Sequence, residues 1–506
     1  MLRDNDSDRR LLDLVHPPEW QNPVPRGRYN LVVIGAGTAG LVAAAGAAGL
    51  GARVALVERA ELGGDCLNVG CVPSKSLLRS AHAAAELRDA ETLGVLGSRG
   101  DTVDFPAAME RMRAVRARIA PNDSAARFSE ELGVDVFFGE GRFSGRREVE
   151  VAGQTLKFRK AVIATGARAT VPPIPGLEEA GYLTNENVFD LEHLPERLLV
   201  LGGGPLGCEL AQAFGRMGAA VTLVELADQF LPREDPEAAR LLFEQLERDG
   251  VDVRLSTGLA RVEGSAGGEK TAILARAGSE ESVVCDQILV AVGRTPNVDG
   301  IGLEAAGVAH ERGRGVIIDD TFRTANPHIY AAGDVCMAHK FTHAADFAAR
   351  AAIQNALFAV GPFGRKKRSK MTIPWCTYTD PEIAQVGLGE AEAAEQGVEI
   401  ETFVRPFSEV DRAIADGRDT GFVKIRVARG RDRILGATVV GYGASDLIGE
   451  IAVARAAGLG LGALASVIHP YPSRAEAIRQ LGDAYNRTRL TPAVKRLFQG
   501  YLDFLR

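Results

Sequence analysis

The sequence predicts an α/β protein in which one doubly wound module occurs twice and is followed by an α+β region. Three observations lead to this fold class. Strand-like and helix-like segments alternate through residues 29–58, with a glycine-rich turn after the first strand. The same order returns 167 positions later, and 12 of 28 positions from 31 to 58 are identical in the two copies. The last region, 371–506, alternates apolar strand-like runs with helices.

Composition places the chain among globular proteins with several domains. Hydrophobic residues make up 46% and charged residues 25% of the 506 residues, which excludes extensive disorder. The net charge of −7 argues against nucleic acid as a partner. Six cysteines are too few for a secreted disulfide scaffold and indicate a reducing compartment. Because the first residues also lack the apolar stretch of a secretory signal, we expect a cytoplasmic protein.

The first module follows a polar, proline-rich arm, which we predict over residues 1–28. The run 29–34 is short and rich in Val and Ile, which is typical of a buried strand. A helix follows the glycine-rich turn, and a second strand ends at Glu58. The uncharged run Leu31–Ala52 is long enough to span a bilayer, but this module explains it, so we expect no membrane span. The turn has the glycines of a G-x-G-x-x-G pattern: Gly35, Gly37 and Gly40.

The second module has the same parts. A strand over 198–201 leads into the turn, a helix runs to Met217, and a strand over 221–224 ends at Glu225. Its turn glycines are Gly202, Gly204 and Gly207.

This pattern is that of Rossmann-like dinucleotide-binding modules. The first glycine permits the tight turn, the second lets the backbone approach a pyrophosphate, and the third lets helix and strand pack closely. The helix N-terminus offers free N–H groups to the phosphates. Glu58 and Glu225 end the second strand of each module, where a carboxylate can accept hydrogen bonds from ribose hydroxyls. Because a carboxylate repels a 2′-phosphate, Glu225 predicts NADH rather than NADPH in the second module.

Two cysteines carry the candidate chemistry. Residues 63–75 read GGDCLNVGCVPSK, with Cys66 and Cys71 in a C-x4-C spacing. Two buried structural thiols remain an alternative, whereas this spacing is unusual for structural zinc and no second ligand pair lies nearby. Two thiols at a helix start can close a small disulfide, and a helix N-terminus or nearby cation stabilises a thiolate. The segment therefore favours a redox-active pair.

This segment resembles the signature of the flavin-dependent pyridine nucleotide–disulfide oxidoreductases, which include dihydrolipoamide dehydrogenase, glutathione reductase and mercuric reductase. The resemblance extends over about residues 29–490. It implies a homodimeric flavoprotein with active sites shared between subunits, in which electrons pass from NADH through FAD and the disulfide to an acceptor. It also implies four domains after the arm: a first FAD-binding part (29–176), an NAD(P)-binding domain (177–300), a second FAD-binding or central part (301–370) and a C-terminal dimerisation domain with a helical tail (371–506).

The resemblance also implies individual roles. Cys71 is the thiol that faces the flavin and forms the charge-transfer thiolate, and Cys66 is the interchange thiol that faces the acceptor. Lys75 and Glu209 match the family's ion pair near the flavin N5. The remaining matches are to cofactor-contacting positions: Thr165, Gly166 and Gly293 in dinucleotide turns, and Asp334 at the FAD ribityl chain.

One departure from the family concerns the residue beside the first cysteine. The family usually has Thr where this chain has Asp65. We expect an acid there to oppose thiolate formation at Cys66.

The C-terminal region bears on the acceptor. Family members that reduce dithiols resemble H-x-H-P-T-x-x-E there, and this chain reads HPYPSRAE over 469–476. Only Pro472 has a glutamate four residues later, Glu476, so that register puts Tyr471 where the catalytic His belongs. A Tyr pKa near 10, against about 6.5 for His, makes a poor proton relay at pH 7.

Tyr at this position resembles mercuric reductases, so we expect a metal ion such as Hg(II), or another small electrophile, as acceptor. Cys66 and Cys71 are then transient ligands of a soft metal substrate, with no permanent metal site. The chain lacks the C-terminal Cys pair of those enzymes, and Glu225 disagrees with their usual NADPH. Two alternatives remain: a dihydrolipoamide dehydrogenase with His469 as surrogate base, and a low-turnover flavin redox sensor.

Two further segments lack a chemical role at this point. The basic run 365–370 is typical of a solvated loop. The amphipathic tail over 492–505 predicts packing or a subunit interface.

Overall fold

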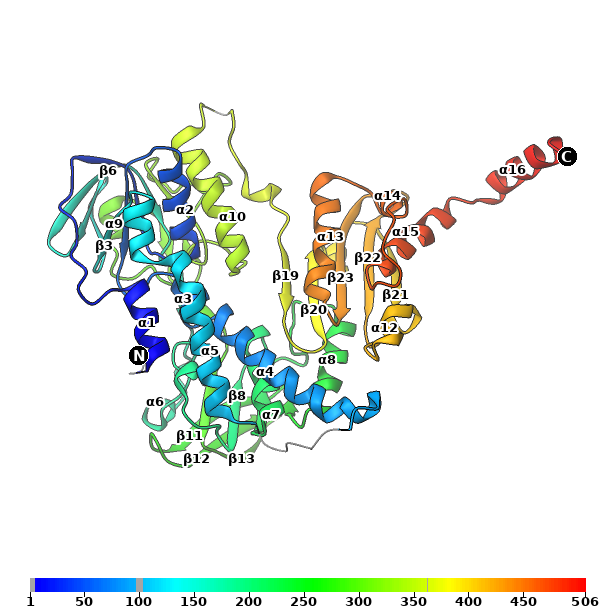
Figure 1. Ribbon diagram of the computed structural model, residues 1–506, viewed down its shortest axis with the longest axis horizontal. Coiled ribbons are helices and arrows are strands. Elements are labelled where there is room, and N and C mark those ends of the chain that lie inside the picture. The colour runs from blue at the N-terminus through cyan, green and yellow to red at the C-terminus, as the bar shows by residue number, and fades with distance from the viewer. Residues whose placement is uncertain (1–4, 97–102, 362) are drawn as a thin grey trace. The chain divides into compact units, whose positions relative to one another are not determined.

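The computed structural model describes residues 5–96, 103–361 and 363–506. Its helices and strands alternate as expected for the predicted α/β fold class (Figure 1). Parallel strands carry both glycine turns, and an antiparallel sheet with helices forms the C-terminal region.

The chain divides into two compact units. One contains the residues up to 226 and the segment 256–371, and the other contains 227–255 and the C-terminal region from 372 onward. The chain therefore leaves the first unit after Leu226 and returns to it at Ser256.

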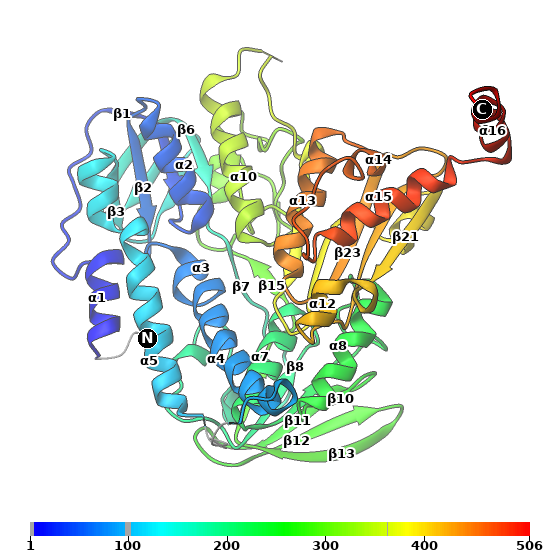
Figure 2. The same ribbon diagram turned by 45° about the vertical axis from the view of Figure 1, so that its right-hand side comes forward.

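The first glycine turn follows a strand of a mostly parallel sheet. β1 pairs in parallel with β2 on one side and with β6 on the other, and Leu31 lies opposite Val54. Helices α2 and α10 pack against each other beside this sheet (Figure 2). The elements are β3 (Asp135–Phe138), β2 (Val54–Glu58), β1 (Arg28–Ile34), β6 (Gln154–Ile163), β5 (Glu148–Val151) and β4 (Arg142–Gly145) in that order, β18 (Ile329–Ala331) paired with β6, and helices α2 (Thr38–Gly49) and α10 (Thr342–Ile353).

The second glycine turn repeats this arrangement. β8 (Arg197–Leu201) lies between the parallel strands β9 (Ala220–Val224) and β14 (Gln287–Val290), and helix α7 (Pro205–Met217) follows the turn. Helix α7 also packs against α4 (Cys71–Asp89), the helix that begins at the second cysteine of the C-x4-C pair. The same unit holds smaller sheets: β11 (Gly258–Gly264), β12 (Lys270–Arg276) and β13 (Ser279–Cys285), and the pair β7 (Ala167–Ala169) and β15 (Arg294–Pro296).

The segment predicted as an N-terminal arm contains a docked helix. Helix α1 (Asp6–Val15) packs against α5 (Phe105–Ile119), and the buried Asp8 carboxylate accepts a hydrogen bond from Arg116 at 2.7 Å. Arg116 also donates to the carbonyl oxygen of Asn68, at the end of the helix that carries Cys66. The sequence alone did not reveal this contact, because the acid and the arginine lie more than a hundred residues apart.

The second unit is built on an antiparallel sheet. Helices α13 and α15 contribute to its core, whereas the tail helix α16 buries no residue. The packing predicted for the tail is therefore not present within one chain. The strands, in order, are β19 (Pro374–Thr377), β20 (Glu382–Gly387), β23 (Ile434–Gly441), β22 (Phe422–Ala428) and β21 (Ile400–Pro406), and the helices are α13 (Ala444–Ala457), α15 (Glu476–Thr488) and α16 (Pro492–Phe504).

No helix in the described part of the chain is both long and apolar enough to cross a membrane. The uncharged run 31–52 is divided between strand β1, the glycine turn and helix α2. Its apolar character therefore reflects burial in the first module.

Candidate functional site

The first glycine turn has the close contacts that its sequence predicts. Gly35 has φ +99°, and a Cβ there would clash with the carbonyl oxygen of Ala164. A Cβ at Gly40 would clash with the carbonyl oxygen of Gly35, so helix α2 can pack closely on strand β1 only with glycine at this position. The Ala36 N–H donates to Glu58 Oε2 at 2.6 Å, which holds the carboxylate across the turn.

The second turn has the same geometry. Gly202 has φ +102°, and a Cβ there would lie 2.7 Å from the carbonyl oxygen of Ala291. A Cβ at Gly207 would meet the carbonyl oxygen of Gly202, just as at the first turn. Gly203 N–H donates to Glu225 Oε2 at 2.7 Å, and Gly204 caps helix α7. The duplication in the sequence is therefore a duplication of backbone geometry.

A cavity of about 620 Å³ opens beside the first turn. Its volume falls within the range of cofactor pockets. Most of the residues predicted to bind the first dinucleotide line it, together with both cysteines: Gly35, Gly37, Glu58, Thr165, Gly166, Asp334, Cys66 and Cys71. Gly40 lies outside the lining and has the packing role described above, and Gly293 lies at a turn with φ +131° beside the lining residue Arg294.

Burial raises the pKa of two carboxyl groups in this cavity. Burial raises the pKa of Glu58, while the backbone N–H groups of Ala36 and Ala60 oppose the rise. Burial likewise raises the pKa of Asp334, and the positive charges of Arg294 and Lys340 oppose it. Both buried carboxyl groups are thus positioned as hydrogen-bonding groups in the lining of the cavity.

The two cysteines lie at the start of adjacent helices. Cys66 is on the short helix α3 (Gly64–Asn68), and Cys71 is the first residue of α4, where the helix N-terminus favours negative charge. Both are free thiols in the structure, and the interaction between them shifts their pKa values in opposite directions. Thr342 Oγ1, at the first residue of α10, lies 3.3 Å from Cys71 Sγ and is hydrogen-bonded to it. The sequence analysis did not identify Thr342, because nothing in its local sequence marks it.

The surroundings favour the thiolate at one of the two positions. The pKa of Cys71 is lowered to about 6 by the hydrogen bond from Cys66, and then by the Thr342 hydroxyl and the charge of Lys75. The pKa of Cys66 is raised by its hydrogen bond to Cys71 and by burial. The reduced pair therefore holds its negative charge on Cys71.

Lys75 and Glu209 form an ion pair next to this thiolate. Lys75 lies one helical turn after Cys71, and its Nζ donates to Glu209 Oε2 at 2.8 Å. The Glu209 side chain on α7 is only 3% exposed, so the pair spans the packed helices α4 and α7.

The structure changes the expectation for Asp65. The guanidinium group of Arg294 contacts the Asp65 carboxylate, donates to the carbonyl oxygen of Ala167 at 2.6 Å and lies 3.7 Å from Asp334. The charge of Asp65 is therefore matched rather than left beside the thiols. A different acid, Asp123, contributes to the raised pKa of Cys66. Arg294 was expected only as part of a dinucleotide-contacting turn with Gly293, and Asp123 was not selected, because each approaches the pair from a distant part of the chain.

The C-terminal candidates lie in the second unit. The Tyr471 hydroxyl donates to Asp411 at 2.8 Å, and this hydrogen bond raises the pKa of Tyr471. Glu476 accepts a hydrogen bond from Arg479 at 2.9 Å. The Tyr471 hydroxyl is thus bound to an acid, Asp411, that the sequence analysis did not predict.

His469 has a more closed environment than Tyr471. Its Nε2 is 3.0 Å from Glu450 Oε1, and its Nδ1 is 3.0 Å from the carbonyl oxygen of Val467. The His469 side chain is 7% exposed, whereas Tyr471 is 71% exposed. Both ring nitrogens of His469 are therefore occupied by partners within the same unit.

The other cysteines are not part of this pair. Cys208, Cys285 and Cys336 are buried and Cys376 is half-buried. Burial raises the pKa of Cys285 to about 11 and that of Cys336 to about 12. Within the described ranges, no group of three or more His, Cys, Asp or Glu side chains could hold a metal ion.

Comparison with known proteins identifies relatives over most of the chain. Residues 29–356 match the family described as pyridine nucleotide-disulphide oxidoreductase, and 373–481 match its dimerisation domain. A mercuric reductase of Lysinibacillus sphaericus is 34% identical over 89% of this chain and 81% of its own length. A dihydrolipoyl dehydrogenase of Thermus scotoductus is 36% identical over 91% of this chain and 98% of its own length.

Solved structures give a similar result. The HOCl-induced flavoprotein disulfide reductase RclA from Escherichia coli has a TM-score of 0.78 and 28% identity, over 90% of this chain and 99% of its own. A Cu(II) complex of the same protein has a TM-score of 0.79 and 28% identity, over 91% of this chain and all of its own.

Proposed function

Because this chain belongs to the pyridine nucleotide-disulphide oxidoreductase family, we propose that it reduces a soft metal ion with electrons from NADH. The chain is a flavoprotein disulfide oxidoreductase, and the proposal concerns its electron donor and acceptor. The observation that carries it is the hydrogen bond from Tyr471 to Asp411, which keeps the hydroxyl protonated at the position of the family's proton relay.

FAD fits the first module. The cavity has an enclosed glycine turn for a pyrophosphate, the Glu58 carboxylate for a ribose and the Asp334 carboxylate for the ribityl chain. FAD, when bound there, supplies the two-electron chemistry that connects a nicotinamide with a disulfide. These residues would hold FAD in the cavity whose lining also contains Cys66 and Cys71.

The nicotinamide donor belongs to the second module. Gly203 N–H fixes the Glu225 carboxylate at the end of β9, where it can accept hydrogen bonds from both ribose hydroxyls. A 2′-phosphate at the same place would meet a negative charge. The residue that follows is the exposed, uncharged Leu226, which cannot compensate for that repulsion. We therefore assign NADH as the preferred donor.

The thiol pair is the electron relay. Two electrons and one proton convert a Cys66–Cys71 disulfide into a Cys66 thiol and a Cys71 thiolate, and the pKa order favours this charge distribution. Lys75 stabilises the thiolate, and Glu209 holds Lys75 in place. Two neighbouring sulfur ligands suit a soft metal ion, which needs thiolates rather than a proton donor.

The names of the relatives agree with a metal acceptor. Relatives named mercuric reductase match most of this chain, and one neighbour was solved as a Cu(II) complex. The match to the dimerisation domain supports a homodimer. In such a homodimer, by the resemblance to the family, Tyr471 would face the disulfide of the other subunit.

A second candidate is dihydrolipoyl dehydrogenase, which the 36% identical relative favours. This activity needs a base near the disulfide, and the histidine of the segment 469–476 is His469. The contacts of His469 with Glu450 and Val467 leave neither ring nitrogen available for this role. Metal reduction is therefore the better supported of the two functions.

The test is NADH oxidation by the purified, FAD-loaded protein with Hg(II) in excess small thiol, beside a parallel assay with dihydrolipoamide and NAD. Metal-dependent oxidation of NADH supports the proposal. Rapid NAD reduction by dihydrolipoamide that is abolished by His469→Ala, with no metal-dependent turnover, supports the second candidate instead.

A further inference from the structure

The first unit carries a group of exposed and half-buried cations near the amino ends of the parallel strands β1 and β18 and along β6. We call it the cationic surface, and its members are Arg28, Arg146, Arg147, Arg159, Lys160, His328, Arg365, Lys366 and Lys367. No ion pair joins any of these side chains to an acid in the described part of the chain. The surface is basic although the whole chain has a net charge of −7.

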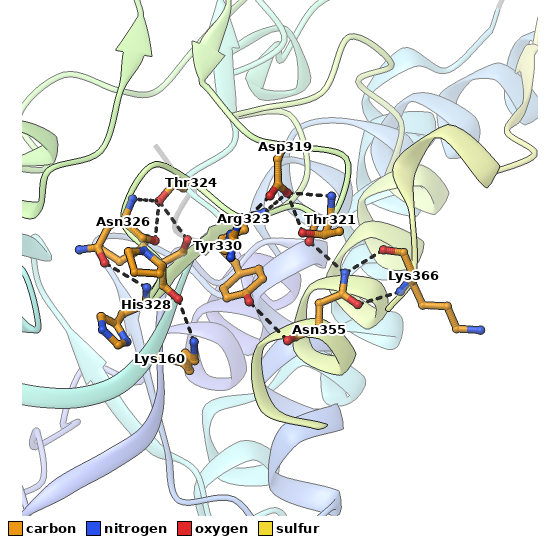
Figure 3. Close-up of polar contacts among 12 residues, drawn as sticks. Lys160, Asp319, Thr321, Arg323, Thr324, Asn326, His328, Tyr330, Asn355 and Lys366 are labelled. Carbon is orange, nitrogen blue, oxygen red and sulfur yellow. Dashed lines mark hydrogen bonds and ion pairs between the residues drawn. The ribbon is translucent and has the colours of Figure 1, made fainter. Parts of the chain in front are cut away.

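Direct contacts hold the central members together. Arg147 contacts the ring of His328, and Lys160 Nζ donates to the carbonyl oxygen of Pro327 at 2.8 Å. The Lys160 ammonium lies 5.5 Å from the centre of the Tyr330 ring (Figure 3). Arg146, Arg147 and His328 line a hollow on this surface.

Neighbouring positive charges lower the pKa of two members of this surface, Lys160 and His328. Burial lowers the pKa of Lys160, and the charges of Arg159, Arg323, Arg147 and Arg365 lower it further. Burial and the charges of Arg147 and Lys160 lower the pKa of His328. The cluster therefore has a shared positive potential that an approaching anion would relieve.

The basic run singled out in the sequence is anchored to this cluster. Asn355 donates to the carbonyl oxygen of Lys366 and accepts from the Lys366 N–H, both at 2.8 Å. The Tyr330 hydroxyl donates to the Asn355 carbonyl oxygen at 3.3 Å, so a chain of contacts joins Lys160, Tyr330, Asn355 and Lys366 (Figure 3). The run is thus fixed beside the other cations.

Nearby acids are engaged elsewhere. Glu148 also lines the hollow and lies 3.8 Å from Lys157, whereas Asp319 lies 3.4 Å from Arg323. Asp320 accepts hydrogen bonds from the N–H and hydroxyl of Ser369 at 2.8 Å. Asp320 also interacts with the charge of Lys367, but in the described part of the chain no acid lies within ion-pair distance of the cations of this surface.

Apolar side chains precede the basic run. Val360 and Phe363 are 79% and 80% exposed, and they face each other across an isolated β-bridge. Phe363 is only two residues before Arg365. Exposed apolar residues directly beside clustered Lys and Arg are the two components of an interfacial membrane-binding element.

This surface is separate from the cofactor cavity. The cavity lies where β1 and β2 end, at Gly35 and Glu58, whereas Arg28 begins β1 and His328 directly precedes β18. Dinucleotides bind at the carboxyl ends of parallel strands. The cations at the amino ends therefore have no part in holding the cofactor.

We propose that the cationic surface docks on an anionic lipid bilayer, with Val360 and Phe363 entering the headgroup region. Val360 is aliphatic and offers no face on which a base could stack, and Tyr330, whose ring lies against Lys160, is buried. Phe363 is an exposed ring beside the basic run, so the test below compares vesicles with a DNA oligonucleotide.

The test is cosedimentation of the full-length, FAD-loaded protein with lipid vesicles. We expect binding to vesicles of phosphatidylcholine and phosphatidylglycerol in equal amounts, and none to phosphatidylcholine alone. Raising the salt to about 0.5 M should weaken the partition coefficient about tenfold or more, because salt screens the lipid charge. Equal binding to both vesicles, or no binding to either, overturns the proposal, and so does binding to a DNA oligonucleotide without binding to vesicles.

Two double variants locate the binding. Val360→Ser with Phe363→Ser removes the apolar pair, and Lys366→Glu with Lys367→Glu reverses two charges; each should weaken binding to anionic vesicles about tenfold or more. The matched controls lie on the exposed tail helix: Phe504→Ser, and Lys495→Glu with Arg496→Glu. Bleaching of the flavin by NADH should be unchanged in all four proteins. If the tail variants lose vesicle binding and the loop variants keep it, the surface has been assigned wrongly.

Discussion

The Cys66–Cys71 segment and the C-terminal loop around Tyr471 serve one proposed reaction, but they relate differently to the family pattern. The segment keeps the family signature over residues 63–75 apart from Asp65, and Arg294 matches the charge of Asp65. In the register that we expect from the sequence, the loop has Tyr471 in place of the catalytic His, and the structure shows its hydroxyl bound to Asp411.

This difference shows where the fold restricts change. The thiol pair must satisfy a helix start, the Thr342 hydroxyl and the Lys75–Glu209 ion pair at the same time, so few substitutions are compatible with it. Under the proposed function, the loop has only to suit the acceptor. An enzyme of this kind can therefore keep its electron relay and change its substrate.

Replacing either member of the thiol pair should have the largest effect. Cys66→Ser or Cys71→Ser prevents disulfide formation, so we expect turnover with NADH and Hg(II) to fall about a thousandfold. Steady-state NADH oxidation measures the loss. The control is Cys376→Ser, which removes a half-buried thiol outside the pair and should retain turnover. Full activity in Cys66→Ser or Cys71→Ser would show that turnover does not need the thiol pair, and this segment would then be no less tolerant of substitution than the C-terminal loop.

Substituting the two members of the ion pair beside Cys71 should shift the pKa of Cys71 in opposite directions, which tests how strictly this segment is constrained. Lys75 lowers this pKa and Glu209 raises it, around a value of about 6. Lys75→Met should therefore move the pH midpoint of Cys71 alkylation in the reduced protein upward by about one unit, and Glu209→Gln should move it downward. Iodoacetamide labelling against pH reads out both. Shifts of the same sign in the two variants would contradict the electrostatic account.

Glu225 should decide between the two nicotinamides. Glu225→Ala removes the charge that repels a 2′-phosphate, so kcat/KM for NADPH relative to NADH should rise about tenfold. Glu225→Asp keeps the charge and is expected to retain the preference for NADH. An unchanged ratio in the alanine variant would assign the preference to other residues.

The C-terminal loop should tolerate substitution best. Tyr471→Phe removes the hydroxyl but no proton relay, so metal-dependent turnover should fall by only about threefold. Tyr471→His restores the residue of the dithiol-reducing enzymes and should raise NAD reduction by dihydrolipoamide. A loss in Tyr471→Phe as large as that in the cysteine variants would show that the hydroxyl acts in catalysis.

The local parts of the fold and site could be predicted from the sequence. Glycine turns require backbone conformations and close approaches that other residues cannot adopt, so Gly35 and Gly202 mark their strands and helices reliably. The cysteine spacing likewise indicated a helix start, and Cys71 is the first residue of α4.

The remaining contacts depend on residues that are distant in the sequence. Arg294 reaches Asp65 across 229 positions, and Thr342 reaches Cys71 across 271. The contact between Asp8 and Arg116 spans 108 positions. It fixes helix α1, which lies within the segment that we predicted as an arm, against α5. Only folding brings these partners together, so no local pattern of residue types could have revealed them.

The most direct test of the electron relay is an anaerobic titration of the FAD-loaded protein with NADH, followed by absorbance. We predict that the first two electrons produce a long-wavelength band from the Cys71 thiolate beside the flavin, and that Cys71→Ser abolishes this band. Complete bleaching of the flavin by those first electrons in the unmodified protein, without a long-wavelength band, would contradict a relay through the Cys66–Cys71 pair.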